Sequence, residues 1–196
     1  MSIASLAFPM SDRKREILQA ALLIIAEDGY GNLTMRALAR SSGMKLGARQ
    51  YHFSTREDML RALVAFIADE IRERFKAATS NVERLTIGEL AEFMLDNTVD
   101  EKYLTDMLWP QLWAMKQVEP LVSELLEDIY AEYLQMLESA IAASGVKDTR
   151  AEALCLMSLL EAESLFAGQG RRWEADRPAM RETILRFIDE RYGEAE

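Results

Sequence analysis

The 196-residue sequence contains one cysteine, one histidine and four prolines, and each scarcity limits what the chain can be. The single cysteine, Cys155, cannot form an internal disulfide, which suits a reducing cytoplasm. It lies in the apolar run LCLMSLL, which predicts a buried and unreactive thiol. The single histidine, His52, has no second histidine or cysteine beside it, so no metal site is expected. A carboxylate-bridged metal bundle would need Glu-x-x-His pairs.

Long apolar segments are also missing. The longest near-apolar run, Ala20–Ala26, is far too short to span a bilayer, so no membrane partner is expected. The N-terminal MSIASLAFPM has no basic region ahead of its apolar residues and is a poor signal peptide. The sequence has no nucleophile elbow, no glycine-rich phosphate loop and no Cys/His metal spacing. We therefore expect a cytoplasmic protein that is not an enzyme and uses no cofactor.

The net charge of −10 is unevenly distributed along the chain. Residues 1–60 hold 8 Lys and Arg against 6 Asp and Glu, whereas the remainder holds 15 against 27. A weakly basic N-terminal part can still bind nucleic acid if the acidic remainder faces away from it. Hydrophobic residues make up 49% of the chain, which is enough for a buried core.

Apolar residues recur at helical spacing along nearly the whole chain, which predicts an all-α fold of about nine helices. Ser11 or Asp12 can cap the first helix, Gly29 ends it, Thr34 can cap the second, and Gly43 supplies the turn that follows. The helices are expected at about 12–28, 35–41, 45–52, 56–79, 83–100, 102–117, 120–143, 149–168 and 177–192. This pattern predicts a flexible extension (1–10), a small N-terminal head (11–55) and a helical body (56–196).

The segment Leu33–Leu60, LTMRALARSSGMKLGARQYHFSTREDML, carries the most specific pattern. It predicts a short helix, a turn, a second short helix and a capped long helix, the order of a helix–turn–helix whose second helix enters the DNA major groove. Its Leu-Thr-x-Arg-x-Leu-Ala, its turn glycine, its aromatic-His-Phe triplet and the basic residue opening the next helix resemble the tetracycline-repressor (TetR-type) regulators. The resemblance covers about residues 12–60. The body is similar only in length, helical content and helix count.

The resemblance implies a role for individual residues of the head. Thr34, Arg36 and Arg56 would contact the phosphate backbone, with Arg36 also near a base. The recognition helix and its flanks would contribute Lys45, Leu46, Gly47, Arg49, Gln50, Tyr51 and His52. Gln50 can pair with adenine, and Arg49 with guanine if it faces the groove. His52 has the alternative role of a surface residue or a pH-sensitive switch, although a phosphate contact is favoured.

The sequence departs from the family pattern at Leu46, Arg49, Gln50 and Arg56, where many relatives carry other residues. These departures are expected to change the operator sequence rather than abolish DNA binding. The run Arg13–Arg15 is equally consistent with a solvated helix face and with phosphate contacts.

Methionines and aromatic residues concentrate in the body, where ordinary core packing explains most of them. Trp109 and Trp113 lie one helical turn apart, and soft methionines beside tryptophan faces suit an adaptable ligand pocket. Glu161 and Glu163 interrupt an apolar helix; they are either exposed or meet a cationic or hydroxyl-bearing ligand. The pocket residues predicted on this basis are Phe93, Tyr103, Met107, Trp109, Trp113, Met157 and Glu161.

The resemblance further implies a homodimer whose last two helices form a four-helix interface. Its predicted residues are Leu154, Met157, Leu165, Ile184, Phe187 and Ile188. Two-fold symmetry then requires a near-palindromic double-stranded DNA operator, with the protein nucleoid-associated when bound. The function expected is that of a regulator, usually a repressor, that a small-molecule effector releases. Two alternatives stay open: a helical ligand-binding or enzymatic bundle with a vestigial head, and a DNA binder without an effector.

Overall fold

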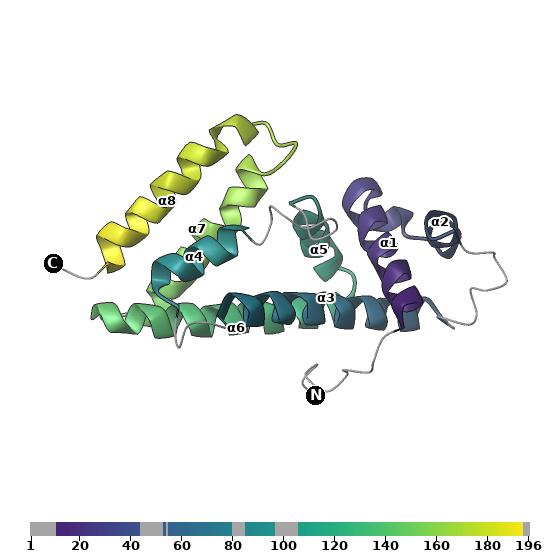
Figure 1. Cartoon of the computed structure of the whole chain (residues 1–196), viewed down its shortest axis with the longest axis horizontal. Helices are drawn as coiled ribbons and strands as arrows, with labels where there is room; N and C mark the ends of the chain where they lie inside the picture. Colours follow the sequence, from purple (N-terminus) through teal and green to yellow (C-terminus); the bar gives the residue numbers. More distant parts are fainter. Residues whose placement is uncertain (1–10, 44–52, 54, 80–84, 97–105, 194–196) are drawn as a thin grey trace. The chain divides into compact units, whose positions relative to one another are not determined.

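The computed structural model describes residues 11–43, 53, 55–79, 85–96 and 106–193, and this part of the chain is helical. It contains eight α-helices, which are labelled in Figure 1, and three short 3-10 turns. The helices are α1 (Asp12–Asp28), α2 (Met35–Ser41), α3 (Arg56–Thr79), α4 (Ile87–Asp96), α5 (Leu108–Lys116), α6 (Pro120–Ile141), α7 (Thr149–Ala167) and α8 (Arg177–Tyr192). The 3-10 turns are η2 (Tyr30–Asn32), η4 (Ala142–Ser144) and η5 (Glu174–Asp176). The all-α prediction is confirmed; the predicted helix at 45–52 lies outside the described residues.

The predicted caps explain why the first helices begin where they do. The Ser11 hydroxyl accepts a hydrogen bond from the Lys14 N–H at 3.3 Å, and the Thr34 hydroxyl accepts one from the Ala37 N–H at 3.1 Å. At the start of α3, Thr55 and Asp58 form a reciprocal capping box with two bonds of 3.0 Å. Each cap satisfies backbone N–H groups that have no partner inside the helix.

Two predicted helix starts are wrong, and local chemistry explains both. The helix expected from residue 83 begins at Ile87, because the Thr86 hydroxyl accepts from the Glu89 N–H at 3.2 Å and the Glu89 carboxylate accepts from the Thr86 N–H at 2.8 Å. The helix expected from residue 102 begins at Leu108. Pro110 therefore lies in the first turn, where its missing N–H costs no helical hydrogen bond.

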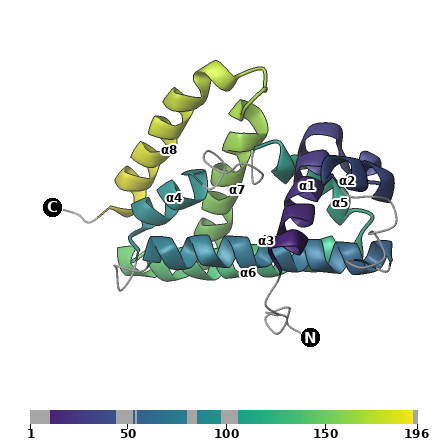
Figure 2. The same ribbon diagram turned by 45° about the vertical axis from the view of Figure 1, so that its right-hand side comes forward.

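One compact unit consists of Met1–Lys76 and Lys102–Glu127. Its core is built on α1, whose apolar stripe includes the buried Ile17, Leu22 and Ile25. Helices α2 and α5 and the turn η2 all pack on α1, and Figures 1 and 2 show α5 alongside it. The short head helices and a helix from much later in the sequence therefore share one core.

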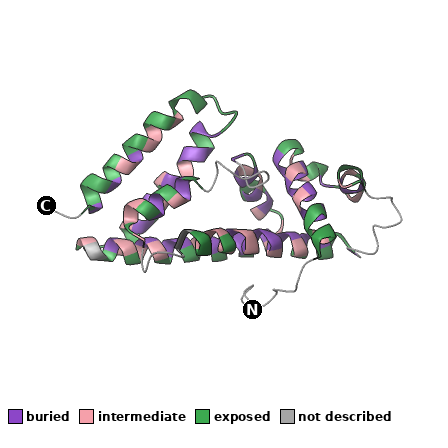
Figure 3. Cartoon of the chain, in the orientation of Figure 1, coloured by how far each residue is buried: buried purple, intermediate pink, exposed green. Residues whose placement is uncertain are grey.

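The second compact unit consists of Ala77–Glu101 and Asp128–Glu196. Within it α4, α7 and α8 pack against one another. Figure 3 shows that α8 is largely exposed and buries only scattered positions, which include Ile184, Ile188 and Tyr192. Helices α3 and α6 each run across a boundary between the two units, at residues 76–77 and 127–128.

The described helices also test two expectations drawn from apolar runs. No helix among them is long and apolar enough to cross a membrane. The prediction that Cys155 is buried is wrong, because its side chain is exposed. The buried stripe of α7 runs through Ala153, Leu156 and Leu160, and Cys155 falls outside it. An apolar run in a helix includes residues on every face, so the run itself does not determine burial.

Candidate nucleic-acid interface

Helix α2 presents the first predicted DNA-contacting residues. Thr34 caps it, while Leu38 and Ala39 are buried against the head core. Burial of this face leaves Arg36 on the exposed side of the same helix. Gly43 follows with a φ of 64°, a left-handed conformation that glycine adopts without steric cost. The geometry up to the turn is that of the first half of a helix–turn–helix.

The second half of the motif lies outside the described residues. This applies to Lys45, Leu46, Gly47, Arg49, Gln50, Tyr51 and His52, so their roles stay predictions. Phe53, which follows them, is buried, and the Lys14 ammonium lies 5.3 Å from its ring centroid. Phe53 thus anchors the chain to the head core immediately before α3.

Arg56, the first residue of α3, belongs to a three-residue group that we call the Arg56 cluster: Tyr30, Arg56 and Glu119. The Arg56 Nη1 donates to Glu119 Oε1 at 3.2 Å, and its Nη2 donates to the Tyr30 hydroxyl. The Tyr30 hydroxyl in turn donates to Glu119 Oε1. The guanidinium carbon lies 5.0 Å from the Tyr30 ring centroid. Sequence reasoning identified Arg56 but missed both of its partners, which are remote in the chain.

Exposure within the Arg56 cluster is uneven. The Arg56 side chain is 56% exposed, whereas that of Glu119 is 19% exposed. Burial, together with the hydrogen bond to Glu119, raises the pKa of Tyr30 to about 12. The tyrosine hydroxyl therefore keeps its proton at neutral pH and can donate to the carboxylate. Tyr30 and Glu119 contact one side of the Arg56 guanidinium, and its other side faces solvent.

The basic run at the start of α1 makes contacts within the protein. Arg13 pairs with Glu16 at 2.6 Å and donates to the Ser42 carbonyl at 2.8 Å. Arg15 pairs with Glu70 on α3. These contacts connect α1 to the turn after α2 and to α3, a structural role that the sequence did not predict beside a solvated face or phosphate contacts.

The predicted pocket residues divide between the two compact units. Met107, Trp109 and Trp113 belong to the first unit, and Phe93, Met157 and Glu161 to the second. Tyr103 lies outside the described residues. Met107 and Trp113 are exposed, whereas Trp109 is buried. The Trp109 indole Nε1–H is buried and has no hydrogen-bond partner among the residues that the structure describes.

Glu161 on α7 is partly buried and receives a hydrogen bond from the Tyr130 hydroxyl of α6 at 2.9 Å. Burial raises the pKa of its carboxyl group, and the bond from Tyr130 opposes that shift. In the described part of the chain, no ion pair to Glu161 accompanies this bond. A partly buried carboxylate with a neutral donor beside it is suited to receive a cationic or hydrogen-bond-donating group.

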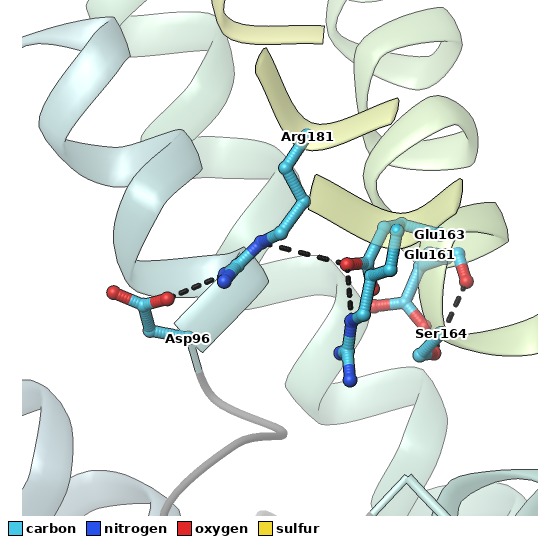
Figure 4. Close-up of polar contacts among 6 residues, drawn as sticks. Asp96, Glu161, Glu163, Ser164 and Arg181 are labelled. Carbon is cyan, nitrogen blue, oxygen red and sulfur yellow. Dashed lines mark hydrogen bonds and ion pairs between the residues drawn. The ribbon is translucent and has the colours of Figure 1, made fainter. Parts of the chain in front are cut away.

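Glu163, two residues further on, is paired within the chain (Figure 4). Its carboxylate accepts from Arg177 Nε at 2.6 Å and from Arg177 Nη2 at 3.1 Å. Arg181 Nε lies 3.4 Å from the same carboxylate, and the other end of its guanidinium reaches Asp96 on α4. The spacing of Arg177 and Arg181 places both on one face of α8, a signal that sequence reasoning overlooked. Glu163 is therefore a structural residue joining α4, α7 and α8.

The predicted dimer-interface residues also separate into two groups. Leu154, Leu165 and Phe187 are exposed, and Met157 is partly exposed. Leu154 and Leu165 are eleven residues, or three helical turns, apart and share one face of α7. Ile184 and Ile188 are instead buried within the chain, so they have little surface left to give to a partner. Their place in the predicted interface is corrected on this ground.

Comparison with known proteins supports the helix–turn–helix interpretation. Residues 17–63 match the family model described as bacterial regulatory proteins, tetR family. The HTH-type transcriptional dual regulator CecR of Shigella flexneri is 36% identical over 72 residues, covering 37% of this chain and 32% of that protein. The chain spans less than half the length of the first four curated relatives that it matches.

Solved structures match over nearly the whole chain. A proposed transcriptional regulator from Saccharomonospora viridis, crystallised with choline, matches with a TM-score of 0.77 and 22% identity, covering 95% of this chain and 100% of that one. A TetR transcription regulator from Haloarcula marismortui ATCC 43049 matches with a TM-score of 0.69 and 22% identity, covering 93% and 97%. At these identities the likeness concerns the fold.

Proposed function

We propose that this chain is a TetR-type transcriptional regulator, which binds a near-palindromic operator as a homodimer and represses transcription there; the match of residues 17–63 to the tetR family model supports this. A small-molecule effector bound to the helical body would release it. The observation that carries the proposal is the capped order of α2, the Gly43 turn and α3, within the segment that matches the family model. This order presents Arg36 and Arg56 at exposed positions on either side of the predicted recognition helix.

The dimer part of the proposal rests on exposed apolar side chains of α7 and α8. Leu154, Leu165 and Phe187 would be buried by a second copy packed around a two-fold axis. The exposed Cys155 lies beside Leu154 and would be covered by the same contact. In such a dimer the two recognition helices must lie about 34–36 Å apart to enter successive major grooves.

We assign the effector a cationic or hydrogen-bond-donating group that meets Glu161. Support comes from the burial of that carboxylate and from its single neutral partner, Tyr130, among the described residues. The relative from Saccharomonospora viridis was crystallised with choline, which carries a positive charge. Choline is therefore a suitable first probe for this chain.

The effector site is tested by titrating the purified protein with choline and with its uncharged carbon analogue, 3,3-dimethylbutanol, while tryptophan fluorescence is followed. We expect a response to choline that is weaker by about tenfold in Glu161→Gln, because a hydrogen bond or ion contact to a charged group is lost. An equal response to both compounds would reject the charged contact.

The effector would act by shifting a population of conformations. The long helix α3 begins at the head and continues into the second compact unit, so a ligand that favours one position of α3 changes the spacing of the two heads. A spacing that no longer matches the half-sites lowers the affinity for the operator.

The whole proposal is tested by selecting bound fragments from a random duplex library at physiological salt. Enrichment of a palindrome would support the dimeric regulator and supply the operator for later work. A folded dimer that enriches nothing would favour the alternative of a ligand-binding bundle with a vestigial head. A palindrome that no effector releases would favour a DNA binder controlled by abundance or by a protein partner.

A further inference from the structure

We propose that Glu119 and the DNA backbone compete for the guanidinium of Arg56, so that the corner between α5 and α6 controls one of the head's phosphate contacts. The inference rests on the proposed DNA-binding function and assigns to that function a regulatory residue outside the helix–turn–helix.

The position of Arg56 explains why a phosphate would approach it. It is the first residue of α3, where the helix dipole favours an anion, although the Asp58 N–H of this turn already donates to the Thr55 hydroxyl. A guanidinium has five N–H donors, and Glu119 and Tyr30 occupy two of them. The Glu119 carboxylate, 3.2 Å from Arg56 Nη1, neutralises the charge of the guanidinium. An incoming phosphate is therefore attracted less strongly than it would be by an unpaired arginine.

Glu119 is the fixed member of the pair. Its backbone N–H donates to the Met115 carbonyl at 2.9 Å, and its carbonyl accepts from the N–H groups of Val122 at 3.0 Å and Ser123 at 3.1 Å. The residue thus lies in the short turn between α5 and α6, bonded to both, and its side chain is mostly buried. Arg56 is the longer and more exposed partner, so it is the one that can turn from the carboxylate toward DNA.

Tyr30 stabilises the arrangement in which Arg56 is paired with Glu119. Its hydroxyl donates to Glu119 and accepts from Arg56, and its ring lies beside the guanidinium. Because the Arg56 side chain is 56% exposed, its ion pair is weak and DNA can displace it, so we expect the pair to change affinity by about twofold to fivefold. Such a contact adjusts operator binding without preventing it.

Helix α6 connects the Arg56 cluster to the proposed effector site. Tyr130, which donates to Glu161, belongs to α6, the helix that begins directly after Glu119 in the chain. A ligand that takes the Glu161 carboxylate from Tyr130 changes a contact of α6, and a shift of α6 along or about its axis changes the reach of Glu119 to Arg56.

The test uses the full chain and measures affinity for the selected operator over a series of salt concentrations. Glu119→Gln keeps the shape of the side chain and removes its charge. We expect it to raise affinity about twofold to fivefold and to steepen the dependence of log affinity on log salt by up to about one. Glu119→Gln in an Arg56→Ala background is expected to change neither quantity. Glu124→Gln, the same charge change at an exposed position of α6, is the matched control and is expected to leave affinity unchanged.

Three results would overturn the inference. A loss of affinity in Glu119→Gln would mean that the carboxylate positions Arg56 for DNA instead of competing with it. An equal gain in the Arg56→Ala background, or in Glu124→Gln, would mean that Glu119 acts only through the overall charge. If the wild-type protein binds no duplex at all, the proposed function fails first. If it binds and Glu119→Gln changes nothing, only the competition is rejected.

Discussion

Arg177 on α8 donates two hydrogen bonds, of 2.6 and 3.1 Å, to the carboxylate of Glu163 on α7, whose side chain is only 1% exposed. Arg181 adds a second cation to the same carboxylate and extends the contact to α4. A buried carboxylate that is fully paired joins three helices at one point, but removing one member of such a group leaves uncompensated charge in a poorly solvated place.

Glu163→Ala is therefore expected to lower the free energy of unfolding by about 3 kcal/mol, or roughly 6–12 °C in Tm. The measurement is thermal and chemical denaturation followed by circular dichroism. Glu182→Ala, at an exposed position of α8, is the control and should change stability by less than about 0.5 kcal/mol. Similar stabilities for the two variants would show that the Glu163 contacts are not coupled to folding.

Unlike Glu163, whose removal is expected to lower stability, the ionised Glu161 carboxylate is expected to lower the stability of the folded protein. Because burial raises its pKa in the folded state, the folded protein binds this proton more tightly than the unfolded chain does. Between the usual pKa of a glutamate and the raised one, stability therefore falls as pH rises, and the loss is complete above the raised pKa. Glu161→Gln removes this dependence.

We expect Glu161→Gln to match or exceed the wild type in free energy of unfolding at pH 7, with the advantage shrinking as pH falls. Denaturation of both proteins between pH 4 and 8 measures it. A variant less stable than the wild type at pH 7, with the deficit shrinking toward low pH, would indicate that the carboxylate is stabilised as an anion, contrary to the pKa shift.

Arg36 and Gln50 are predicted to contribute to DNA binding in different ways. Arg36→Ala should weaken binding to every sequence and reduce the salt dependence by about one unit of slope, because a phosphate contact is lost. Gln50→Ala should relax the preference at one base pair and leave the slope unchanged. Anisotropy titrations on the operator and on single-base variants, at several salt concentrations, separate the two. Equal loss on all sequences for Gln50→Ala would reject its role in base readout.

The exposed apolar face of α7 and α8 predicts the oligomeric state. Phe187→Glu places a charge where a second copy would pack, so sedimentation should show a shift from dimer toward monomer. Glu190→Ala, another exposed change on α8, should leave the assembly unchanged. If Phe187→Glu sediments like the wild type, the dimer contact lies elsewhere.

The sequence by itself determined the helical fold, most helix boundaries and the helix–turn–helix up to its turn at Gly43, because these follow from local rules. Apolar periodicity selects helices, and caps such as Thr34 and the Thr55–Asp58 pair act over three residues. The two misplaced starts, at Ile87 and Leu108, were also local in origin: a capping box at Thr86 and a proline in the first turn.

Only the tertiary structure decided which charged and apolar side chains meet. Arg56 contacts Tyr30 and Glu119, which are 26 and 63 residues away, and Glu163 meets Arg177 across two helices. Burial of Ile188 and exposure of Cys155 likewise depend on how helices pack. A helical period fixes which residues share a face, but the partner of that face comes from distant parts of the chain, and so the pairing of long, flexible charged side chains is not encoded in local spacing.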